Sequence, residues 1–180
     1  MPRTDRPLPE VRLVPGSLVL FDADQAGDHV ALAGLLGVAP LVEWPPVGGE
    51  HDADAVAFFR GALAADPSAS EWLAFYVCVD GALVGSAGFM GPPVGGTTEI
   101  GYSICQSHRR RGIATAAVGA LVRRARAAGA TRLSARVEPG NGGSIEVLTR
   151  NGFVAGPHDR TDGDNHLHVE LDLSPGTCAR

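Results

Sequence analysis

The sequence predicts a mixed α/β domain, and three observations support this fold class. The chain has 180 residues, and one domain commonly occupies about 100 to 200 residues. Patterns typical of strands and helices alternate along it in the order β-α-α-β-β-β-α-β-α-β-β. Two strand-like runs flank the turn-forming pair Asp80 and Gly81, which indicates a hairpin. We therefore expect one layered sheet covered by helices.

The first third of the chain is expected to hold a lead-in, one strand and two helices. Residues 1–15 contain four prolines and alternating charges, which indicate a loosely held segment. The run SLVLFD at residues 17–22 is interpreted as a strand. A helical pattern follows over residues 24–36, with Asp24 as its N-cap, and a second one covers residues 52–66.

The rest of the chain is expected to contain most of the sheet and two more helices. An alanine-rich helix is predicted at residues 112–128 and a short helix at residues 142–150. The predicted strands are residues 71–79, 82–90, 97–105, 131–138, 152–156 and 165–173. Residues 16–173 then form the domain, and residues 174–180 form a tail.

Several features favour a soluble, cytoplasmic protein. The longest apolar stretch, residues 30–42, is interrupted by glycine and proline and is shorter than the roughly 18 residues of a membrane span. The N-terminus lacks the apolar segment of a secretory signal. Cys78, Cys105 and Cys178 are an odd number of cysteines without metal-type spacing, which favours a reducing compartment.

The charged residues exclude some functions and favour others. All 15 basic residues are arginine, so a Walker-type phosphate loop, a Schiff base and a catalytic lysine are excluded. Residues 1–108 hold 4 arginines and 13 acidic residues, whereas residues 109–180 hold 11 arginines and 7 acidic residues. This asymmetry favours an anionic ligand on the C-terminal part. It also favours a cationic ligand on the N-terminal part, where a solvated acidic surface is the alternative.

The stretch QSHRRRGIATAAV, residues 106–118, has the features of an anion site. Three arginines and a glycine precede the alanine-rich helix, where the helix dipole disfavours cations by about 0.3 to 1 kcal/mol each. A bound anion removes this penalty, and backbone N–H groups at a helix N-terminus bind anions directly. A nucleic-acid surface is disfavoured, because the protein is acidic and the cluster contains no interleaved aromatic residues.

Two motifs in this region resemble the GNAT superfamily of N-acetyltransferases. RRRGIA, residues 109–114, fits the signature R/Q-x-x-G-x-G/A, and NGGSIEVLTRNGF, residues 141–153, is similar to the segment that follows it in that family. The runs EIGYSI and EWLAFYVCVDGALVGSAGF are similar to the RimJ/RimL branch, which acetylates N-terminal amines of ribosomal proteins. The similarity covers roughly residues 16–173. It implies the GNAT fold, with a mostly antiparallel sheet of six to seven strands and about four helices.

The resemblance implies acetyl-CoA as the acetyl donor and assigns residues to it. In the family the pyrophosphate lies on amides of the signature loop, where Gly112 leaves room for it and arginine side chains assist. The preceding strand pairs its backbone with the pantetheine arm. Asn141 holds that arm, and a turn role for Asn141 is the alternative. The implied contacts are Ser103, Ile104, Cys105, Arg109, Arg110, Arg111, Gly112, Ile113, Ala114, Thr115 and Asn141.

The resemblance also implies direct attack of a neutral amine on the thioester. Glu99 is the candidate for the base, acting directly or through water, and an exposed strand carboxylate is the alternative. Many relatives use a tyrosine as the acid seven residues after the asparagine, where this chain has Leu148. Ser144 is then the candidate acid, with Tyr102 in reserve. Weak proton-transfer groups favour an acceptor of modest basicity, because about a tenth of an α-amine is neutral at pH 7.

The expected function is therefore acetyl transfer to the amine of a peptide N-terminus or of a small molecule. The alternative is a GNAT-like module that binds acyl-CoA without useful chemistry, which Leu148 favours. Trp44, Phe58 and Phe59 are candidates either for an acceptor pocket or for the core. The chain is expected to be a monomer or a homodimer, on resemblance alone.

No nucleic acid, membrane or metal is expected among the partners. His166 and His168 lie on one face of a predicted strand, and Asp162 or Asp164 are the nearest further ligands. None of these has the spacing of a third ligand in a metal site, so strand polarity is the preferred explanation for the two histidines.

Overall fold

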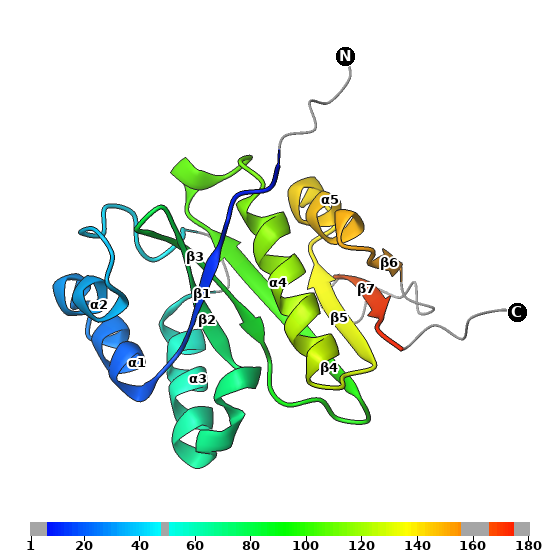
Figure 1. Cartoon of the computed structure of the whole chain (residues 1–180), viewed down its shortest axis with the longest axis horizontal. Coiled ribbons are helices and arrows are strands. Elements are labelled where there is room, and N and C mark those ends of the chain that lie inside the picture. Colours follow the sequence, from blue (N-terminus) through cyan, green and yellow to red (C-terminus); the bar gives the residue numbers. More distant parts are fainter. Residues whose placement is uncertain (1–6, 48–50, 156–165, 175–180) are drawn as a thin grey trace, which may run out of the picture.

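The computed structural model describes residues 7–47, 51–155 and 166–174, which form a seven-stranded sheet with helices on both faces (Figure 1). The strand order is β1-β2-β3-β4-β5-β7-β6, and every neighbouring pair is antiparallel except β4 and β5. The predicted mixed, mostly antiparallel sheet is therefore confirmed. The strands are β1 (Arg12–Pro15), β2 (Ala74–Val79), β3 (Ala82–Phe89), β4 (Thr97–Ile104), β5 (Arg132–Val137), β6 (Val154–Ala155) and β7 (Leu167–Asp172).

Five α-helices lie in the described part of the chain. They are α1 (Leu18–Gln25), α2 (His29–Leu36), α3 (Ala53–Ala65), α4 (Ile113–Ala127) and α5 (Gly142–Arg150). Two short 3-10 helices, η1 (Pro67–Trp72) and η2 (Gln106–His108), precede β2 and α4. Within the described ranges, no helix has the length and hydrophobicity needed to cross a membrane.

The predicted hairpin and the helices of the second half are confirmed. The hairpin turn at Asp80 and Gly81 joins β2 to β3, and both residues have positive φ, 49° and 74°, as a two-residue turn of this kind requires. The helices predicted at residues 52–66, 112–128 and 142–150 correspond to α3, α4 and α5.

The structure differs from the prediction at the first two helices, α1 and α2. Residues 17–22 are not a strand, because the Ser17 hydroxyl accepts a hydrogen bond from the Leu20 N–H and caps α1. A short apolar run is compatible with a strand and with a helix, and here the N-cap at Ser17 favours the helix. Asp24 lies inside α1 and is not an N-cap. Asp28 caps α2 instead, directly after Gly27, whose φ of 66° separates the two helices.

The lead-in predicted at residues 1–15 is also too long. Arg12–Pro15 forms β1, which pairs with β2 and places Leu13 opposite Val77. The strand predicted at residues 152–156 is only the two-residue β6, and the one at 165–173 is β7. Residues 1–6 and most of the predicted tail, residues 175–180, lie outside the described residues.

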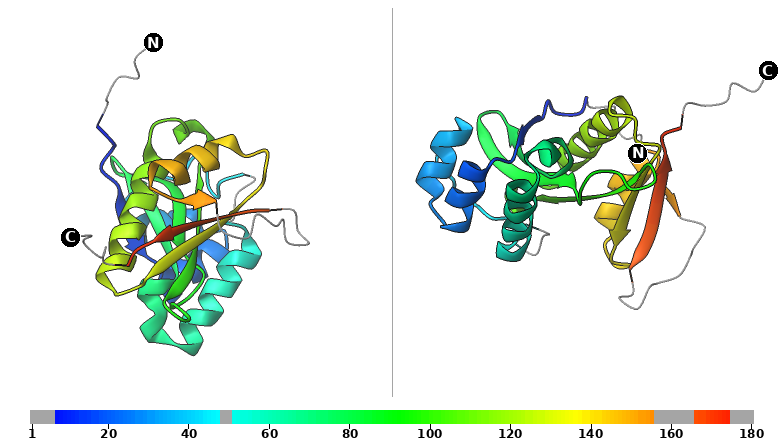
Figure 2. Two further views of the ribbon diagram at one scale, coloured as in Figure 1. Left: turned by 90° about the vertical axis from the view of Figure 1, so that its right-hand side faces the viewer. Right: turned by 90° about the horizontal axis from the view of Figure 1, so that it is seen from below.

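Two hydrophobic cores lie on opposite faces of the sheet, with α4 over one face and α3 over the other (Figure 2). Alternation along the strands separates the two cores, since Phe75 and Val77 of β2 belong to the α4 core and Tyr76 and Cys78 to the α3 core. The sheet thus presents two chemically independent surfaces, called here the α4 face and the α3 face.

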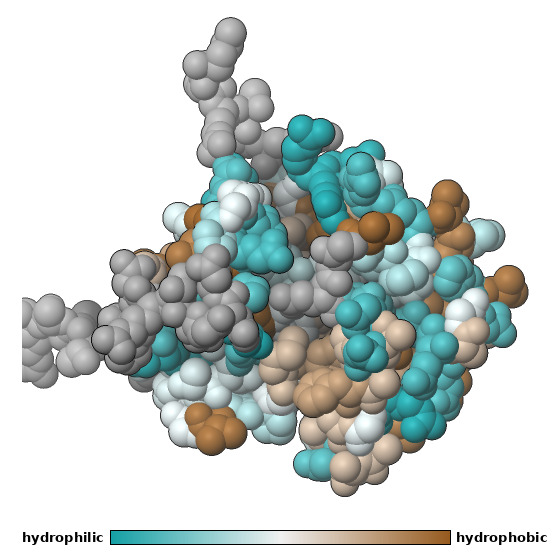
Figure 3. Space-filling view, turned by 180° about the vertical axis from the view of Figure 1, so that it is seen from behind, coloured by the Kyte–Doolittle hydropathy of each residue, from teal (hydrophilic) through white to brown (hydrophobic). Residues whose placement is uncertain are grey.

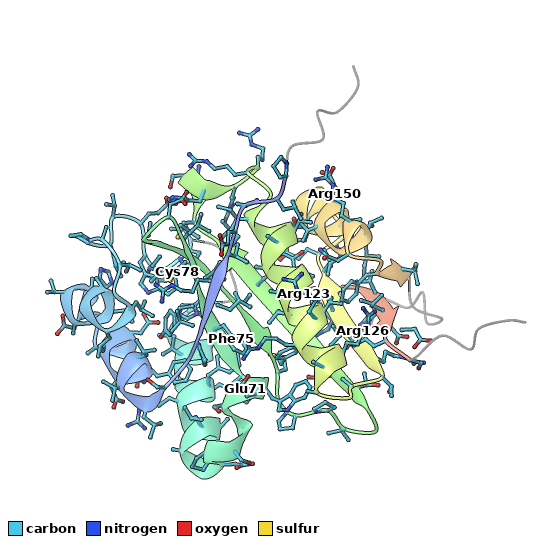
Figure 4. The ribbon with its side chains drawn as sticks, in the orientation of Figure 1. Glu71, Phe75, Cys78, Arg123, Arg126 and Arg150 are labelled. Carbon is cyan, nitrogen blue, oxygen red and sulfur yellow. The ribbon has the colours of Figure 1, made fainter. Side chains whose placement is uncertain are left out.

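The helix α4 is anchored to the sheet through Arg124. Its guanidinium forms an ion pair with Glu71 and lies 4.7 Å from the ring centroid of Phe75. Figure 4 shows Glu71 and Phe75 beside α4, which also carries Arg123 and Arg126. Because α4 is fixed along its length, the loop at its N-terminus has a defined position relative to β4.

Candidate active site

A cleft opens where β4 and β5 stop pairing. Thr97, Thr98 and Glu99 pair with Arg132, Leu133 and Ser134, and the parallel register ends there. The following parts of both strands line a cleft of about 870 Å³, which reaches the start of α4 and the first turn of α5. Because β3 occupies only one edge of β4, the other edge faces this cleft with backbone groups that can pair with an extended ligand.

The loop before α4 is shaped to present backbone N–H groups to the cleft. Arg110 has a φ of 61°, an uncommon value for a residue with a side chain, and Gly112 has a φ of 80°. The first bond inside α4 runs from the Ala116 N–H to the Gly112 carbonyl, so the N–H groups of the preceding residues point out of the helix. Such an arrangement binds anions.

Gly112 is required at this position for two reasons. A side chain is strained at a φ of 80°, and an added Cβ would lie 3.1 Å from a methyl carbon of Leu8 and 3.4 Å from Pro9. The loop that sequence analysis predicts as an anion site is therefore closed on one side by the N-terminal segment.

The structure brings most of the predicted donor-binding residues together. Arg111 is exposed and does not line the cleft. The residues that do line it are Ser103, Ile104, Arg109, Arg110, Gly112, Ile113, Ala114, Thr115 and Asn141.

Cys105 and Arg109 are engaged inside the protein. The Cys105 N–H donates to the Val84 carbonyl and its thiol donates to the Glu43 carbonyl, so Cys105 lies outside the cleft wall. Burial, together with the charge of Glu43, raises the pKa of this thiol to about 11. The Arg109 guanidinium donates to the carbonyls of Ile104 and Val47 at 2.8 and 3.3 Å. Its side chain thus braces the end of β4, although it also lines the cleft.

Glu43 fixes the entrance to the same loop. Its carboxylate accepts hydrogen bonds from the Gln106 N–H at 2.5 Å and from the N–H and hydroxyl of Ser107 at 3.1 and 2.5 Å. The Ser107 hydroxyl is the largest cause of a lowered pKa for this carboxyl. Sequence analysis did not identify Glu43, because its partners lie more than 60 positions further along the chain.

The two candidates for the acid lie side by side. The Tyr102 hydroxyl donates to the Ser144 carbonyl at 3.1 Å, and both residues line the cleft. Asn141 is the N-cap of α5, since its side-chain oxygen accepts from the Ser144 N–H at 3.0 Å. The turn role that sequence analysis kept open for Asn141 is thus real, and the residue also faces the cleft. Leu148 is buried, 1% exposed, in the place of the usual tyrosine.

Glu99 lies on β4 but outside the cleft wall. Its carboxylate accepts a hydrogen bond from Nε of Arg136 at 2.9 Å, and its side chain is 29% exposed. Glu99 shares a strand face with Gly101 and Ser103, because side chains alternate along β4. A proton acceptor at this position has to act next to a guanidinium.

A buried polar cluster on the α3 face was missed by sequence analysis. The Asp24 carboxylate accepts three hydrogen bonds, from Trp44 Nε1 at 2.7 Å, His51 Nε2 at 2.7 Å and the Tyr76 hydroxyl at 2.9 Å. The side chains of His51 and Asp24 are 3% and 5% exposed. Burial opposes the charge of Asp24, but the hydrogen bonds from His51, Trp44 and Tyr76 outweigh it and lower the pKa of this carboxyl.

The cluster could not be recognised in the sequence because the first helix was predicted to start at Asp24, whereas it starts at Leu18. With α1 beginning after Ser17, Asp24 falls three to four residues from Leu20 and Phe21 on one helix face, and both are buried. A carboxylate on that face needs buried partners. The aromatic candidates divide accordingly: Trp44 and Phe59 belong to the α3 core, whereas Phe58 is 53% exposed.

A second cavity, of about 20 Å³, lies between this cluster and β4. Gly101 and Tyr102 line both this cavity and the large cleft. The remaining lining residues are His51, Phe59, Ala74, Ser86, Ala87, Gly88 and Met90. The two hollows therefore meet at β4, one on each side of it.

A family model now connects these features with known proteins. The model of the acetyltransferase (GNAT) domain matches residues 20–154. The chain belongs to the GNAT family. Together with the relatives below, this match makes the protein an acetyltransferase. In the described ranges of this GNAT domain, no group of three His, Cys, Asp or Glu side chains could hold a metal ion, and the earlier candidates Asp162 and Asp164 lie outside those ranges.

The similar proteins agree with the family and with the fold. The GNAT domain is 30% identical over 148 residues to the uncharacterized N-acetyltransferase YjdG of Bacillus subtilis (strain 168), covering 80% of this chain and 86% of that protein. Mycobacterium smegmatis RimJ in complex with CoA-disulfide is 26% identical, with a TM-score of 0.60 over 90% of this chain and 81% of RimJ. The structure of yncA from Salmonella typhimurium with acetyl-CoA shares the fold at 18% identity, with a TM-score of 0.57 over 94% and 98% of the two chains.

Proposed function

We propose that this GNAT domain transfers the acetyl group of acetyl-CoA to a primary amine, either the α-amine of a peptide or the amine of a small molecule. The observation that carries the proposal is the cleft between β4 and β5, which ends at the outward-pointing N–H groups before α4. Its volume of about 870 Å³ lies within the range of about 300 to 1,000 Å³ that ligand pockets occupy. RimJ and yncA, which share the fold, hold CoA-disulfide and acetyl-CoA.

The donor is proposed to bind mainly through backbone groups. The N–H groups of Ile113, Ala114 and Thr115 receive the pyrophosphate, and the Arg110 side chain adds positive charge at the cleft wall. The pantetheine arm extends along the open edge of β4 at Ser103 and Ile104. Asn141 borders this path from the start of α5.

The reaction is proposed to proceed by direct attack. A neutral amine attacks the thioester carbonyl carbon, and an N–H of β4 stabilises the oxyanion that develops. The C–S bond then breaks, and the thiolate receives a proton from Ser144 or from Tyr102, which is bonded to the Ser144 carbonyl. Glu99 is the base that the family resemblance implies. Its bond to Arg136 must open, or a water must connect it to the amine.

The acceptor is proposed to be an α-amine, as in the RimJ/RimL branch, and to meet the protein in the cytoplasm. The 26% identity to RimJ over 90% of this chain supports this narrower assignment. The predominance of acidic residues in residues 1–108 favours a cationic acceptor on that side.

A thiol-release assay with acetyl-CoA tests the proposal. A panel of peptides with free N-termini, polyamines and aminoglycosides should contain an acceptor that raises thiol release above the rate without amine. Coenzyme A affinity is measured in parallel by calorimetry. Binding without release on any amine would favour the non-catalytic acyl-CoA module, which the buried Leu148 also fits. Absence of coenzyme A binding would overturn both functions.

A further inference from the structure

The ring of His51 is held in one tautomer by Asp24. The lowered pKa of Asp24 keeps its carboxylate ionised at neutral pH, and an ionised carboxylate only accepts hydrogen bonds. Nε2 of His51 is therefore the donor to Asp24, and in the neutral form of the ring Nδ1 is the nitrogen without a proton. Among the described residues, Nδ1 has no hydrogen-bond partner. In its neutral form the ring thus has an imidazole nitrogen whose lone pair is not used by the cluster.

His51 lines the small cavity at β4. Gly88 and Gly101 are partners across β3 and β4, and neither has a side chain to fill the space that His51 borders. The cavity of about 20 Å³ exceeds the roughly 10 to 15 Å³ needed for one water, so it accepts a group the size of an ammonium head. Gly101 and Tyr102 connect it to the cleft proposed for the donor.

The access side of the cavity suits an amine with an apolar stem. Met90, 38% exposed, is part of the cavity wall, and Phe59 contributes an aromatic ring. Figure 3 shows that the surface on the side opposite to α4 carries an apolar area among polar residues. Phe59 and Met90 thus offer apolar contacts to the carbon chain of an acceptor whose nitrogen enters the cavity.

The charge of the cluster favours a cation at the same place. Trp44 and Tyr76 donate to Asp24 as neutral groups, and burial together with the charge of Asp24 raises the pKa of Tyr76, which keeps it protonated. These donors stabilise the negative charge without neutralising it. A proton delivered to His51 produces a buried, hydrogen-bonded ion pair with Asp24.

We propose that His51, oriented by Asp24, is the proton acceptor for a primary ammonium group that enters the small cavity beside Gly101. This inference rests on the proposed acetyl transfer. One proton moves from the ammonium nitrogen to Nδ1 of His51, and the freed lone pair forms the bond to the acetyl carbon. The C–S bond breaks with its electron pair on sulfur, and the thiolate takes a proton from Ser144 or Tyr102. The second proton of the nitrogen replaces the proton that this residue gave up, and His51 returns its own proton to solvent.

His51 meets this task more directly than Glu99. Glu99 lines neither the cleft nor the small cavity, and one of its oxygens is bonded to Arg136. His51 lines the small cavity and is held by a carboxylate from behind, the arrangement by which enzymes fix an imidazole for proton transfer.

The test compares His51→Gln with wild type on two acceptors of different basicity. Alaninamide carries an α-amine of the class with pKa about 7.7 to 8.0, and butylamine is about as basic as a lysine side chain, with pKa near 10.4. At pH 7, His51→Gln should lower kcat/KM about 100-fold for butylamine, the lower end of general-base effects, and at most about 10-fold for alaninamide, because about a tenth of an α-amine is neutral without a base. At pH 9 the loss should nearly disappear for alaninamide, which is then neutral by itself, and persist for butylamine.

Two further variants make the comparison decisive. His29→Gln, at the start of α2 and away from both cavities, should keep wild-type rates. Unchanged coenzyme A affinity of His51→Gln shows that the donor side is intact. A loss that is equal at pH 7 and pH 9 for both amines would overturn the proposal, because it indicates a structural role. So would a pH-dependent loss that appears with Glu99→Gln and not with His51→Gln.

A measurement without turnover separates this inference from the proposed function. Protein with ¹⁵N-labelled histidine and bound coenzyme A is titrated with methylamine hydrochloride, and His51→Gln identifies the His51 signals. The Nδ1 resonance of His51 should shift, with saturation, as the bound ammonium group donates a hydrogen bond to this nitrogen. A wild-type protein that shows this change but releases no thiol would refute acetyl transfer and leave the amine site standing. No change at His51 would refute the site itself.

Discussion

The two sides of β4 are built on different principles. On the cleft side, the groups that we propose to receive the donor are backbone N–H groups of one short loop and one open strand edge. On the α3 side, the polar groups are the side chains of Asp24, Trp44, His51 and Tyr76, which come from α1, β2 and the loop between α2 and α3. The first surface depends on backbone shape and the second on side-chain identity. Substitutions should therefore act differently on the two sides.

The largest effect is expected for the stability of the α3 side. Asp24→Ala leaves three buried donors without an acceptor and should lower the free energy of unfolding by about 3 kcal/mol, measured by urea denaturation. Asp28→Ala, which removes only the exposed cap of α2, should cost about 1 kcal/mol. Equal losses for the two variants would show that the buried cluster contributes no more than a helix cap.

Next in size is the effect of Gly112→Glu on donor affinity. A side chain at a φ of 80°, carrying negative charge beside the proposed pyrophosphate, should weaken coenzyme A binding at least 100-fold, or about 2.7 kcal/mol. Gly129→Glu is the matched control, because Gly129 lies after the other end of α4 with a φ of 82° and open space around it. Calorimetry should find normal affinity for this control. Normal coenzyme A affinity of Gly112→Glu would show that the pyrophosphate does not bind at this loop.

A smaller effect is expected for the groups that we propose to protonate the thiolate. Ser144→Ala should lower kcat about 10-fold without changing coenzyme A affinity, because the donor is held by backbone groups. Tyr102→Phe removes the hydroxyl bonded to the Ser144 carbonyl and provides the comparison. If Tyr102→Phe reduces kcat and Ser144→Ala does not, the tyrosine is the acid.

The smallest effect is the response of the α3 side to acid. Hydrogen bonds lower the pKa of Asp24 in the folded protein, so its ionisation stabilises the fold above the ordinary value of 3.8. This contribution is lost as the pH falls through the lowered pKa. The difference in unfolding free energy between wild type and Asp24→Asn should narrow as the pH falls below about 4. A difference independent of pH would mean that the charge of Asp24 does not matter.

The sequence predicted the cleft side well because that side is local. The loop from Arg109 to Ala114 and the segment after Asn141 carry their spacing in short continuous motifs, and the structure places both at one cleft. The pattern could not show that the N–H of Cys105 is bonded to Val84, which leaves Cys105 outside the cleft lining.

The α3 side could not be predicted in the same way. Asp24 and Tyr76 are 52 positions apart, and only the packing of α1 against the sheet brings them together. The first helix was placed wrongly, since the apolar run after Ser17 fits a strand as well as a helix. With the helix misplaced, Asp24 was interpreted as a cap and not as a buried acceptor.

The central claim is that the donor binds on the cleft side of β4 through the loop at the start of α4. Amide chemical shifts of ¹⁵N-labelled protein, recorded while coenzyme A is added, test it most directly. The account predicts saturating changes at Ile113, Ala114 and Thr115 and along Ser103 and Ile104, with little change in α1 and α3. Saturating changes confined to α1 and α3, with the amides of the first turn of α4 unchanged, would contradict it.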